Sequence, residues 1–388
     1  MMTPPKKTMS PAFLGAFTVL LLAGVGCSKD EPASPSDDTS EQDTTPTDTS
    51  DDTGTTDDTA PPTDDTGTSH IDTSDSGPTD TDTTGDTDTG GDTAPEIEVF
   101  DCAKAPALPE AETIIEGARG HKGLAFDAEG HIVGSDGSSL IKATYDGEQT
   151  VWIPGESELE QLDYLSGGDL VSTNGYGAGL VKRYTPEGGE TVLASGLDCY
   201  SIIAAPNDML FCAGWNGAYT IDPDSGEYTQ FLTDGEPDFP RGVSARTLAF
   251  SRDFSELYIG TIDNSGRIYT LGLDKDYIPT GKPEVFAEGL GRGWHDGLDI
   301  DVCGNVYAVD YATSSLYRAS SDGATVTTLA DWSGPGGTFG HGLEFGGGLG
   351  GWRADAIYLP MPTGDKQVKE IVIGIPGNMW AGEVLNAP

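Results

Sequence analysis

Three histidines and an aspartate recur at equivalent places in the chain, each shortly before a small apolar stretch. His121 precedes GLAF, His295 and Asp296 precede GLDI, and His341 precedes GLEF. Imidazole nitrogens and carboxylate oxygens bind zinc, and carboxylate oxygens bind calcium. If the fold brings these four side chains together, they could hold a single divalent metal, calcium or zinc.

Other polar residues at neighbouring positions could supply acid–base chemistry. Glu160 and Asp198 are candidate bases that would move a proton, and Arg246 could stabilise a developing negative charge. The alternative is a polar channel mouth without a metal, with solvated histidines and an ion pair of Lys122 with Glu160 or of Arg246 with Asp296. The residue types alone leave both interpretations open.

The elements that would position these residues are copies of one sequence pattern: a short apolar strand, a tight turn, a second strand and a polar connecting segment. The copies begin at Gly123, Leu162, Ser201, Thr247, Gly297 and Gly342. They recur roughly every 38 to 50 residues, which is typical of the blades of a β-propeller. Turn pairs such as Glu129-Gly130 and Asn207-Asp208 suit the hairpin within each copy. The sequence therefore predicts an all-β fold, a six-bladed β-propeller of four-stranded blades over residues 97–388.

The first and last parts of this region are expected to pair with each other. The segment 100–116 precedes the first full copy, and the fourth strand of the last copy, in GEVLNAP, is short. We predict that the early segment supplies a strand to the last blade and so closes the ring.

Alignment of the copies on their turns gives two columns of residues just before the first strand of each copy. The nearer column holds Lys122, Glu160, Cys199, Arg246, Asp296 and His341. The preceding column holds His121, Leu159, Asp198, Ala245, His295 and Gly340. Because first strands converge on the propeller axis, both columns are expected at one mouth of the central channel.

The stretches GLAFDAEGHIV, HDGLDIDVCGNVYAVDYATSSLYRASSDG and RTLAFSRDFSELYIGTIDNSGRIYTLGL resemble regucalcin/gluconolactonase (senescence-marker) propellers and the related NHL-repeat propellers, over about residues 115–385. The resemblance implies one divalent metal on the axis, held by Glu, Asn and Asp residues just before inner strands. Asp296, before Gly297, matches the aspartate of that pattern. Lys122 stands at the glutamate position and Arg246 at an asparagine position, and two cations there would repel a metal. Some NHL-type lyases bind zinc through axial histidines.

The N-terminal residues 1–27 are typical of an export signal. Two lysines precede the apolar run Ala12–Leu22, which is too short to span a bilayer. The following LLLAGVGC resembles the lipobox of bacterial lipoproteins, which implies that Cys27 is lipidated and becomes the mature N-terminus. An ordinary signal peptide cleaved elsewhere is the alternative. We expect a bacterial envelope lipoprotein of the outer membrane or cell surface.

Residues 28–96 consist almost entirely of Asp, Thr, Ser, Gly and Pro. Such a segment cannot bury enough apolar surface to offset its ordering entropy, so it is expected to be a disordered linker. The net charge of −44 argues against nucleic acid as a partner and against contact of the protein surface with anionic lipid. We expect a monomer that meets the membrane only through its anchor.

Four cysteines remain in the predicted propeller: Cys102, Cys199, Cys212 and Cys303. Export allows disulfides. With a turn centred on Asn207–Asp208, Cys212 would lie opposite Ile203, which places Cys199 too far away for a bridge. The cysteines are expected to be buried, or paired in ways that the sequence leaves unassigned.

Two functions fit these features. One is a lipid-anchored propeller that binds a small ligand or a surface partner at its channel mouth. The other is a metal-dependent lactone hydrolase or lyase that uses the residues named above. No Gly-rich phosphate loop or nucleophile elbow is present, so kinase and serine hydrolase chemistry are not indicated.

Overall fold

The computed structural model describes residues 100–156, 159–174, 179–334, 340–361 and 367–378. The predicted export signal, Cys27, the acidic linker and GEVLNAP lie outside these ranges, so their structure stays a prediction. Among the described residues, no helix has the length and apolar character needed to cross a membrane.

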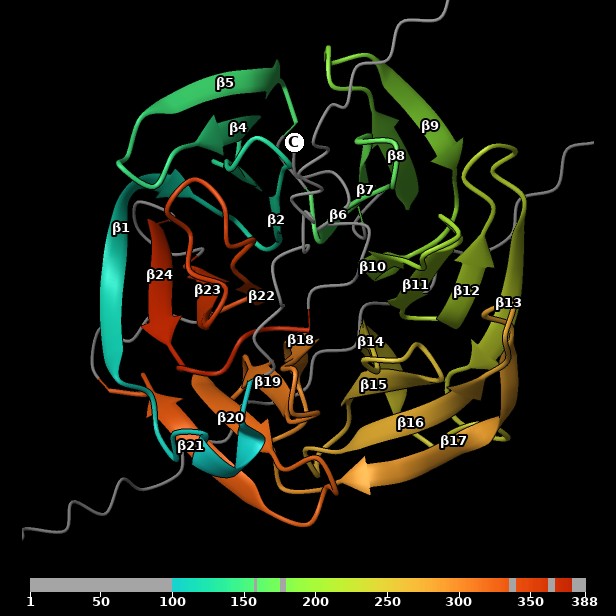
Figure 1. Ribbon diagram of the computed structural model, residues 1–388. Coiled ribbons are helices and arrows are strands. Elements are labelled where there is room, and N and C mark those ends of the chain that lie inside the picture. Colours follow the sequence, from blue (N-terminus) through green and yellow to red (C-terminus); the bar gives the residue numbers. More distant parts are fainter. Residues whose placement is uncertain (1–99, 157–158, 175–178, 335–339, 362–366, 379–388) are drawn as a thin grey trace, which may run out of the picture. The chain divides into compact units, whose positions relative to one another are not determined.

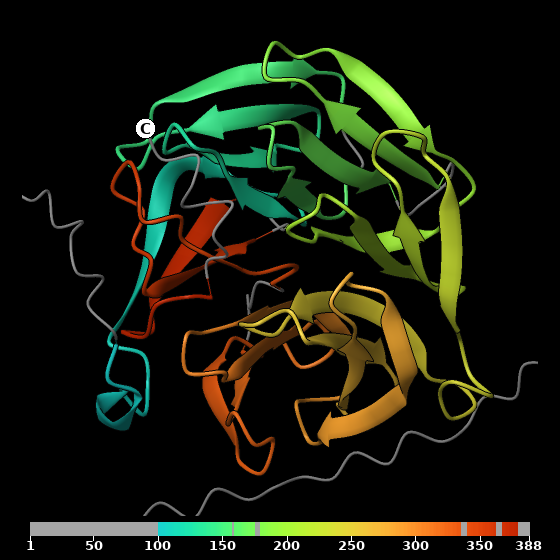
Figure 2. The same ribbon diagram turned by 45° about the vertical axis from the view of Figure 1, so that its right-hand side comes forward.

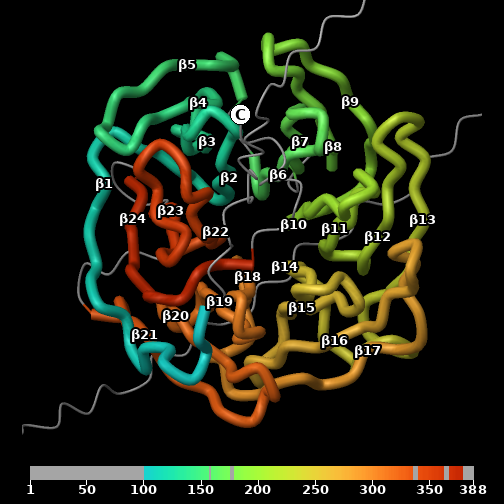
Figure 3. The backbone as a smooth tube through the Cα atoms, in the orientation of Figure 1, coloured from blue at the N-terminus to red at the C-terminus, as the bar shows by residue number. Residues whose placement is uncertain are grey.

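Six antiparallel sheets of four strands surround a central axis, as the ribbon in Figure 1 and the tube in Figure 3 show. The prediction of a six-bladed β-propeller with four-stranded blades is confirmed. In each blade one strand lies beside the axis, and the others lie progressively farther out (Figure 1). We call the six strands beside the axis, β2, β6, β10, β14, β18 and β22, the inner strands.

The blades follow the order of the chain. Blade 1 contains β2 (Leu124–Phe126), β3 (Ile132–Ser135), β4 (Ser139–Ala143) and β5 (Gln149–Pro154). Blade 2 contains β6 (Leu162–Tyr164), β7 (Leu170–Asn174), β8 (Leu180–Tyr184) and β9 (Glu190–Ala194). Blade 3 contains β10 (Cys199–Ala204), β11 (Leu210–Gly214), β12 (Gly217–Ile221) and β13 (Tyr228–Thr233).

Blade 4 contains β14 (Ser244–Phe250), β15 (Glu256–Ile262), β16 (Ile268–Leu273) and β17 (Pro279–Ala287). Blade 5 contains β18 (His295–Ile300), β19 (Val306–Asp310), β20 (Ser315–Ala319) and β21 (Val326–Asp331). Blade 6 contains β22 (Glu344–Phe345), β23 (Ala356–Pro360), β24 (Gln367–Val372) and β1 (Ala111–Arg119).

The ring closes because β1 is the outermost strand of blade 6. It pairs with β24 in antiparallel register, with Ala111 opposite Val372 and Ile115 opposite Val368. Figure 1 shows β1 beside β24, although the two strands come from opposite ends of the propeller sequence. The predicted closure by the segment before the first copy is confirmed, with a strand that starts later and extends to Arg119.

The apolar core is divided into six clusters, and each cluster lies between two neighbouring blades. Between blades 3 and 4, for example, Phe211 and Ala213 pack with Leu248 and Ile259. A single sheet cannot bury both of its faces, so each blade is stabilised by the two beside it. Figure 2 shows this face-to-face stacking of twisted sheets around the ring. The inner strands that form the channel wall are therefore held in position by the packing of neighbouring blades.

The turn after each of the first five inner strands contains one residue in the left-handed backbone region. Gly130, Gly168 and Gly304 supply it in blades 1, 2 and 5, and Asp208 supplies it in blade 3. In blade 4 the residue is Phe254, with φ of 56°. A side chain in this region costs about 1–2 kcal/mol of steric strain, so blade 4 places a bulky ring where glycine would be easier to accommodate.

Two disulfides join the four cysteines of the propeller. Cys102, in the 3-10 helix η1 (Cys102–Lys104), is bonded to Cys303 in the turn between β18 and β19. Cys199 is bonded to Cys212, with their Cα atoms 5.7 Å apart. Both bonds are compatible with an oxidising compartment.

The prediction that Cys199 and Cys212 lie too far apart for a bridge is wrong, for two reasons. Cys212 lies opposite Ile202, and not opposite Ile203 as the turn position suggested. A β-bulge at Tyr200 then adds a residue to β10, so that Cys199 lies opposite Gly214. The bulge turns Cys199 to the same face of the sheet as Cys212, and the two side chains share one buried cluster.

Candidate functional site

Five charged or titratable side chains from five blades meet at one end of the central channel. This charged cluster consists of Lys122, Glu160, Arg246, Asp296 and His341. Each member lies at or just before the start of an inner strand, where convergence on the axis brings distant parts of the sequence together. All five belong to the nearer predicted column. In blade 3 the bulge puts Tyr200, and not Cys199, into the lining.

Ion pairs satisfy most of the cluster. Lys122 Nζ lies 2.5 Å from Glu160 Oε1. Arg246 Nη2 lies 2.9 Å from Asp296 Oδ1, and His341 Nδ1 lies 2.7 Å from Asp296 Oδ2. Both ion pairs of the alternative expected from the sequence, Lys122 with Glu160 and Arg246 with Asp296, are present. The solvated histidines of that alternative are not observed at His295, which is buried, or at His341, which contacts Asp296.

Arg246 is also held by an aromatic side chain. Its guanidinium carbon lies 3.4 Å from the centroid of the Tyr200 ring, a close cation–π contact. The indole nitrogen of Trp215 donates a hydrogen bond to the Tyr200 hydroxyl. Arg246 is only 5% exposed, so this cation cannot leave Asp296 and Tyr200 without losing buried contacts.

Burial and pairing act in opposite directions on the two acids of the cluster. Burial raises the pKa of Glu160, and the nearby Lys122 and Arg246 reduce this rise. Burial alone would raise the pKa of Asp296 as well, but the charges of Arg246 and His341 outweigh it and lower that pKa below its ordinary value. Asp296 is therefore an ionised carboxylate in an internal salt bridge.

The residues of this cluster do not fit the metal site that the family resemblance implies. Both oxygens of Asp296 already face Arg246 or His341, and Glu160 faces Lys122. A metal would need ligand atoms at about 2.0–2.6 Å, in the space that these cations fill. The cavity inside the cluster has a volume of about 10 Å³, which is at most the room for one water molecule.

Other residues predicted for the site lie outside the lining of this cavity. His295 is completely buried, with Nε2 2.8 Å from the Leu290 carbonyl and Nδ1 accepting the Thr261 N–H at 3.3 Å. Burial lowers the pKa of His295, which favours a neutral ring. Asp198 lies 3.5 Å from the side-chain amide of Asn216. Of the four predicted metal ligands, the structure brings Asp296 and His341 into contact.

A larger cavity lies farther along the same channel, and we call it the channel cavity. Its volume is about 100 Å³. The wall includes the middle and the carboxyl-terminal parts of the inner strands from blades 2 to 6. Gln161 and Ser201 line both cavities and form the boundary between them.

Three carboxylates occupy one position of the inner strands in the channel cavity. Asp163, Asp299 and Glu344 each pair across the hairpin with the corresponding residue of the second strand. In blades 1 and 4 the same position holds Ala125 and Ala249. These acids are not among the site residues predicted from the sequence, although an acid inside an apolar strand, in LDY, LDI and LEF, is a signal that marks them.

Two of these carboxylates tie neighbouring blades together. The Ala204 N–H of blade 3 donates to Asp163 Oδ2 at 2.6 Å, and the Phe345 N–H of blade 6 donates to Asp299 Oδ2 at 3.0 Å. Burial raises the pKa of each aspartate to about 7. Among the described residues, neither one forms an ion pair with a lysine, an arginine or a histidine. The pKa of these two aspartates is thus raised, whereas the pKa of Asp296 is lowered.

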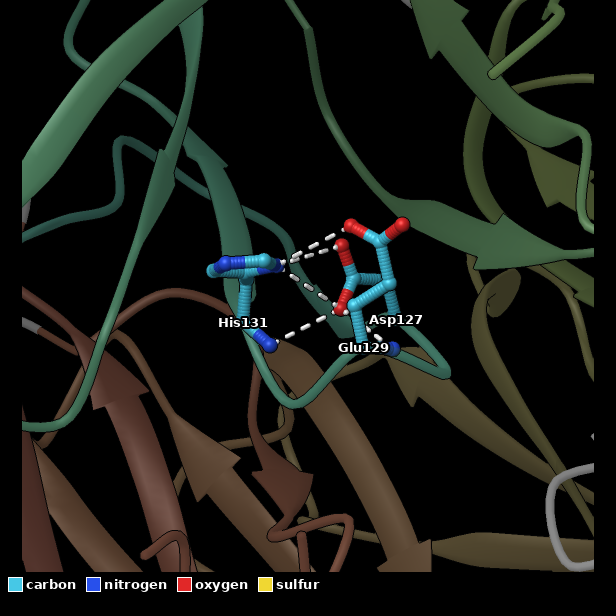
Figure 4. Close-up of side chains that lie close together, drawn as sticks. All are labelled: Asp127, Glu129 and His131. Atoms are coloured by element: carbon cyan, nitrogen blue, oxygen red, sulfur yellow. Dashed lines mark hydrogen bonds and ion pairs between the residues drawn. The ribbon is translucent and has the colours of Figure 1, made fainter. Parts of the chain in front are cut away.

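A third group of titratable residues lies in the turn between β2 and β3. Asp127, Glu129 and His131 offer ligand atoms within 4.8 Å of one another and could hold a cation. Figure 4 shows the three side chains gathered on one hairpin turn. These three residues are not among the metal ligands predicted from the sequence.

This turn already has a structural function. Asp127 Oδ1 accepts the N–H groups of Glu129 and His131, and Asp127 Oδ2 lies 2.8 Å from Lys142 Nζ. In blade 5, Asp301 accepts two turn N–H groups in the same way. Burial would raise the pKa of Asp127, but the bond to Lys142 and the turn N–H groups outweigh it and lower that pKa. Turn formation therefore explains the group without a metal.

Comparison with known proteins supports the fold and does not show a family or an activity. No family model matches the chain, and no curated protein matches it. Solved structures do match. A gluconolactonase from Xanthomonas campestris has 15% identity and a TM-score of 0.53, covering 68% of this chain and 89% of its own.

Two further structures are similar to the same degree. A calcium-binding protein, regucalcin, from Agrobacterium tumefaciens has 19% identity and a TM-score of 0.52, covering 70% of this chain and 96% of its own. An auxiliary nutrient binding protein from Bacteroides thetaiotaomicron has 16% identity and a TM-score of 0.52, covering 66% and 69%. The likeness is one of fold. At these identities it carries neither activity nor ligand to this chain.

Proposed function

We propose that this protein is an exported, lipid-anchored β-propeller that binds a small ligand in its central channel. The observation that carries this proposal is the contrast within the channel: the charged cluster closes one end by its own ion pairs, and a cavity of about 100 Å³ remains beyond it. Concave sites with a few polar groups on an apolar wall are typical of ligand binding. One of the similar structures is described as a nutrient binding protein, which agrees with a binding role.

The rival function is a metal-dependent hydrolase or lyase acting on a lactone or a similar small polar substrate. It is favoured by the fold shared with a gluconolactonase and a calcium-binding regucalcin. It is disfavoured by Lys122 and Arg246, which place cations where ligands would be needed and neutralise Glu160 and Asp296. The geometry therefore supports ligand binding over lactone hydrolysis.

The test of the two functions is the metal content and metal response of the purified propeller. We expect substoichiometric calcium and zinc by elemental analysis, and a melting temperature that chelator changes by less than about 1 °C, since a ligand bound only to the folded state would raise stability. We also expect no hydrolysis of a lactone such as glucono-1,5-lactone above the uncatalysed rate.

About one metal ion per chain, lost together with lactone hydrolysis in an Asp296→Ala/His341→Ala variant, would overturn the proposal. Asp127→Asn is the matched control. A metal lost in that variant alone would belong to the β2–β3 turn, and the proposal for the channel would stand.

The anchor rests on the sequence before the propeller. Cys27 at the end of an apolar export signal, followed by an acidic linker, supports a lipoprotein tethered away from the membrane surface. Metabolic labelling with a fatty acid tests it. We expect label on the wild-type protein and none on Cys27→Ala, and equal labelling of the two would contradict the anchor.

A further inference from the structure

The channel cavity combines acidic side chains with an aromatic wall. Asp163 and Asp299 come from blades 2 and 5, and both retain part of their surface in contact with the cavity. Phe250 and Phe254 line the same space, with ring centroids 5.4 Å apart. Carboxylates beside aromatic rings are the chemistry by which proteins bind organic ammonium ions.

Asp163 and Asp299 have hydrogen-bond acceptor positions left for a ligand. Asp163 receives the backbone N–H groups of Tyr164 and Ala204, and Asp299 receives those of Ile300 and Phe345. Each carboxylate has about four acceptor positions, so two remain on each. In the described part of the chain no cationic side chain is paired with either aspartate, whereas the carboxylates of the charged cluster are both paired.

The backbone conformation of Phe254 indicates that its ring has a function at the cavity. Its backbone is left-handed, where three of the other turns have glycine, at a cost of about 1–2 kcal/mol. Residues kept in such a conformation against a steric cost are concentrated at functional sites. The ring contacts Phe250 and Tyr277 and forms part of the cavity wall.

The volume of the cavity limits the size of the ligand. A buried apolar cavity of about 150 Å³ accommodates benzene. A cavity of about 100 Å³ therefore admits a group of roughly four to five non-hydrogen atoms. The ion pairs of the charged cluster close the far side, so such a group must enter from the end at which Phe254 lies.

We propose that the channel cavity binds a small organic cation, an ammonium group on a short apolar body, with the ammonium between Asp163 and Asp299 and the apolar body against Phe250 and Phe254. This inference rests on the proposed function and adds the ligand class and the end of the channel that receives it.

The test uses three probes of similar size and different charge. Butylammonium, 1-butanol and butyrate are titrated into the purified propeller by calorimetry at pH 7.5. We expect binding of butylammonium alone. Asp163→Asn and Asp299→Asn should each weaken it at least about tenfold, because each removes one charged hydrogen-bond acceptor. Asp146→Asn, in an exposed turn of blade 1, is the matched control and should change the affinity by less than about twofold.

A second measurement on the wild-type protein does not depend on the folding of any variant. An ammonium ion favours the ionised carboxylates, so binding near pH 7 should release protons, seen as a dependence of the heat on the ionisation enthalpy of the buffer. Asp163, Asp299 and Glu344 line the cavity, and the charges of Asp163 and Asp301 act on Asp299. Proton release should disappear at pH 9, where Asp163 and Asp299, each with a pKa of about 7, are ionised before the ligand arrives.

The outcomes separate this inference from the proposed function. Equal binding of 1-butanol, binding of butylammonium without proton release at pH 7, or no binding of butylammonium would each overturn the organic cation. If a small neutral ligand binds instead and Gln161→Ala or Phe254→Gly changes its affinity, the channel still binds a ligand and the proposed function stands. If no compound of a broad metabolite set binds, both fail.

Discussion

The two ends of the central channel use the same kind of residue for opposite purposes. At the charged cluster, Asp296 is neutralised by Arg246 and His341, and its pKa is lowered. In the channel cavity, Asp163 and Asp299 receive only backbone N–H groups, and burial raises the pKa of each to about 7. The ion pairs of the charged cluster fill the space at their end and close the channel. In the channel cavity space remains, and no cationic side chain of the described residues is paired with either aspartate.

This difference shows why a shared fold is a weak guide to activity. Inner strands of any propeller bring a ring of side chains to the axis, and the chemistry depends on which positions hold cations. Here lysine and arginine supply the counter-charge to Glu160 and Asp296 from within the chain. The acids of this site are therefore already paired with cations of the chain, and our proposal places ligand binding in the other part of the channel.

The largest expected effect comes from breaking the buried ion pair of the charged cluster. Arg246→Met should lower the free energy of unfolding by about 3–5 kcal/mol, because Asp296 is left buried with one cation fewer. Urea denaturation measures it. Lys275→Met, which breaks the exposed pair with Asp276, is the control and should cost less than about 1 kcal/mol. A cost for Arg246→Met no larger than that of the control would contradict a structural role for the cluster.

The pH dependence of stability should have opposite signs at the two ends. An aspartate whose pKa rises on folding binds its proton more tightly when folded, so its contribution is full below about pH 4 and is lost as pH rises through about 7. The pKa of Asp296 is lowered on folding, so this residue adds stability at pH values above the pKa that it has in the unfolded chain. That added stability is lost in acid. Stability should therefore fall between about pH 5 and pH 8 and also at pH values below about 4.

Thermal unfolding at pH 5.5 and pH 8 tests the cavity end. We expect a melting temperature lower by at least a few °C at pH 8 in the wild type, and a smaller difference in the double variant Asp163→Asn/Asp299→Asn. Part of the difference should remain, since burial also raises the pKa of Asp234, to about 6. An unchanged pH difference in the double variant would contradict the raised pKa values.

A smaller effect is expected at the boundary between the cavities. Gln161 donates a hydrogen bond to the Asp296 carbonyl at 3.1 Å and lines both spaces. Gln161→Ala should cost about 1 kcal/mol for the lost bond and should join the two cavities. Pentylammonium and hexylammonium should then gain affinity relative to butylammonium. An unchanged preference for chain length would mean that another residue sets the depth of the cavity.

The smallest effect on stability is expected for Phe254→Gly. Relief of about 1–2 kcal/mol of backbone strain should offset the lost ring contacts, leaving a net change within about 1 kcal/mol in either direction. Binding of butylammonium should nevertheless weaken several-fold, because the aromatic wall is gone. Denaturation and calorimetry on the same protein separate the two results. A large loss of stability with normal binding would assign Phe254 to the core and not to the site.

Much of the architecture could be read from the chain. The alternation of apolar residues and the turn pairs depend on local backbone geometry, so they predicted six blades and the closing strand β1 before any contact was known. The nearer column also placed Lys122, Glu160, Arg246, Asp296 and His341 at one end of the channel, because equivalent positions of a repeat share one environment.

Only the tertiary structure decided what these residues do. Which side chains pair depends on differences of an ångström between blades, and the bulge at Tyr200, invisible as a pattern, changed the register that bonds Cys199 to Cys212. Burial of His295 comes from the packing of blade 4 against blade 5, and the charge state of Asp163 and Asp299 comes from the ring around them. Periodicity is a local property that sequence determines directly, whereas desolvation and ion pairing are properties of the closed ring, in which every blade contributes to the environment of the others.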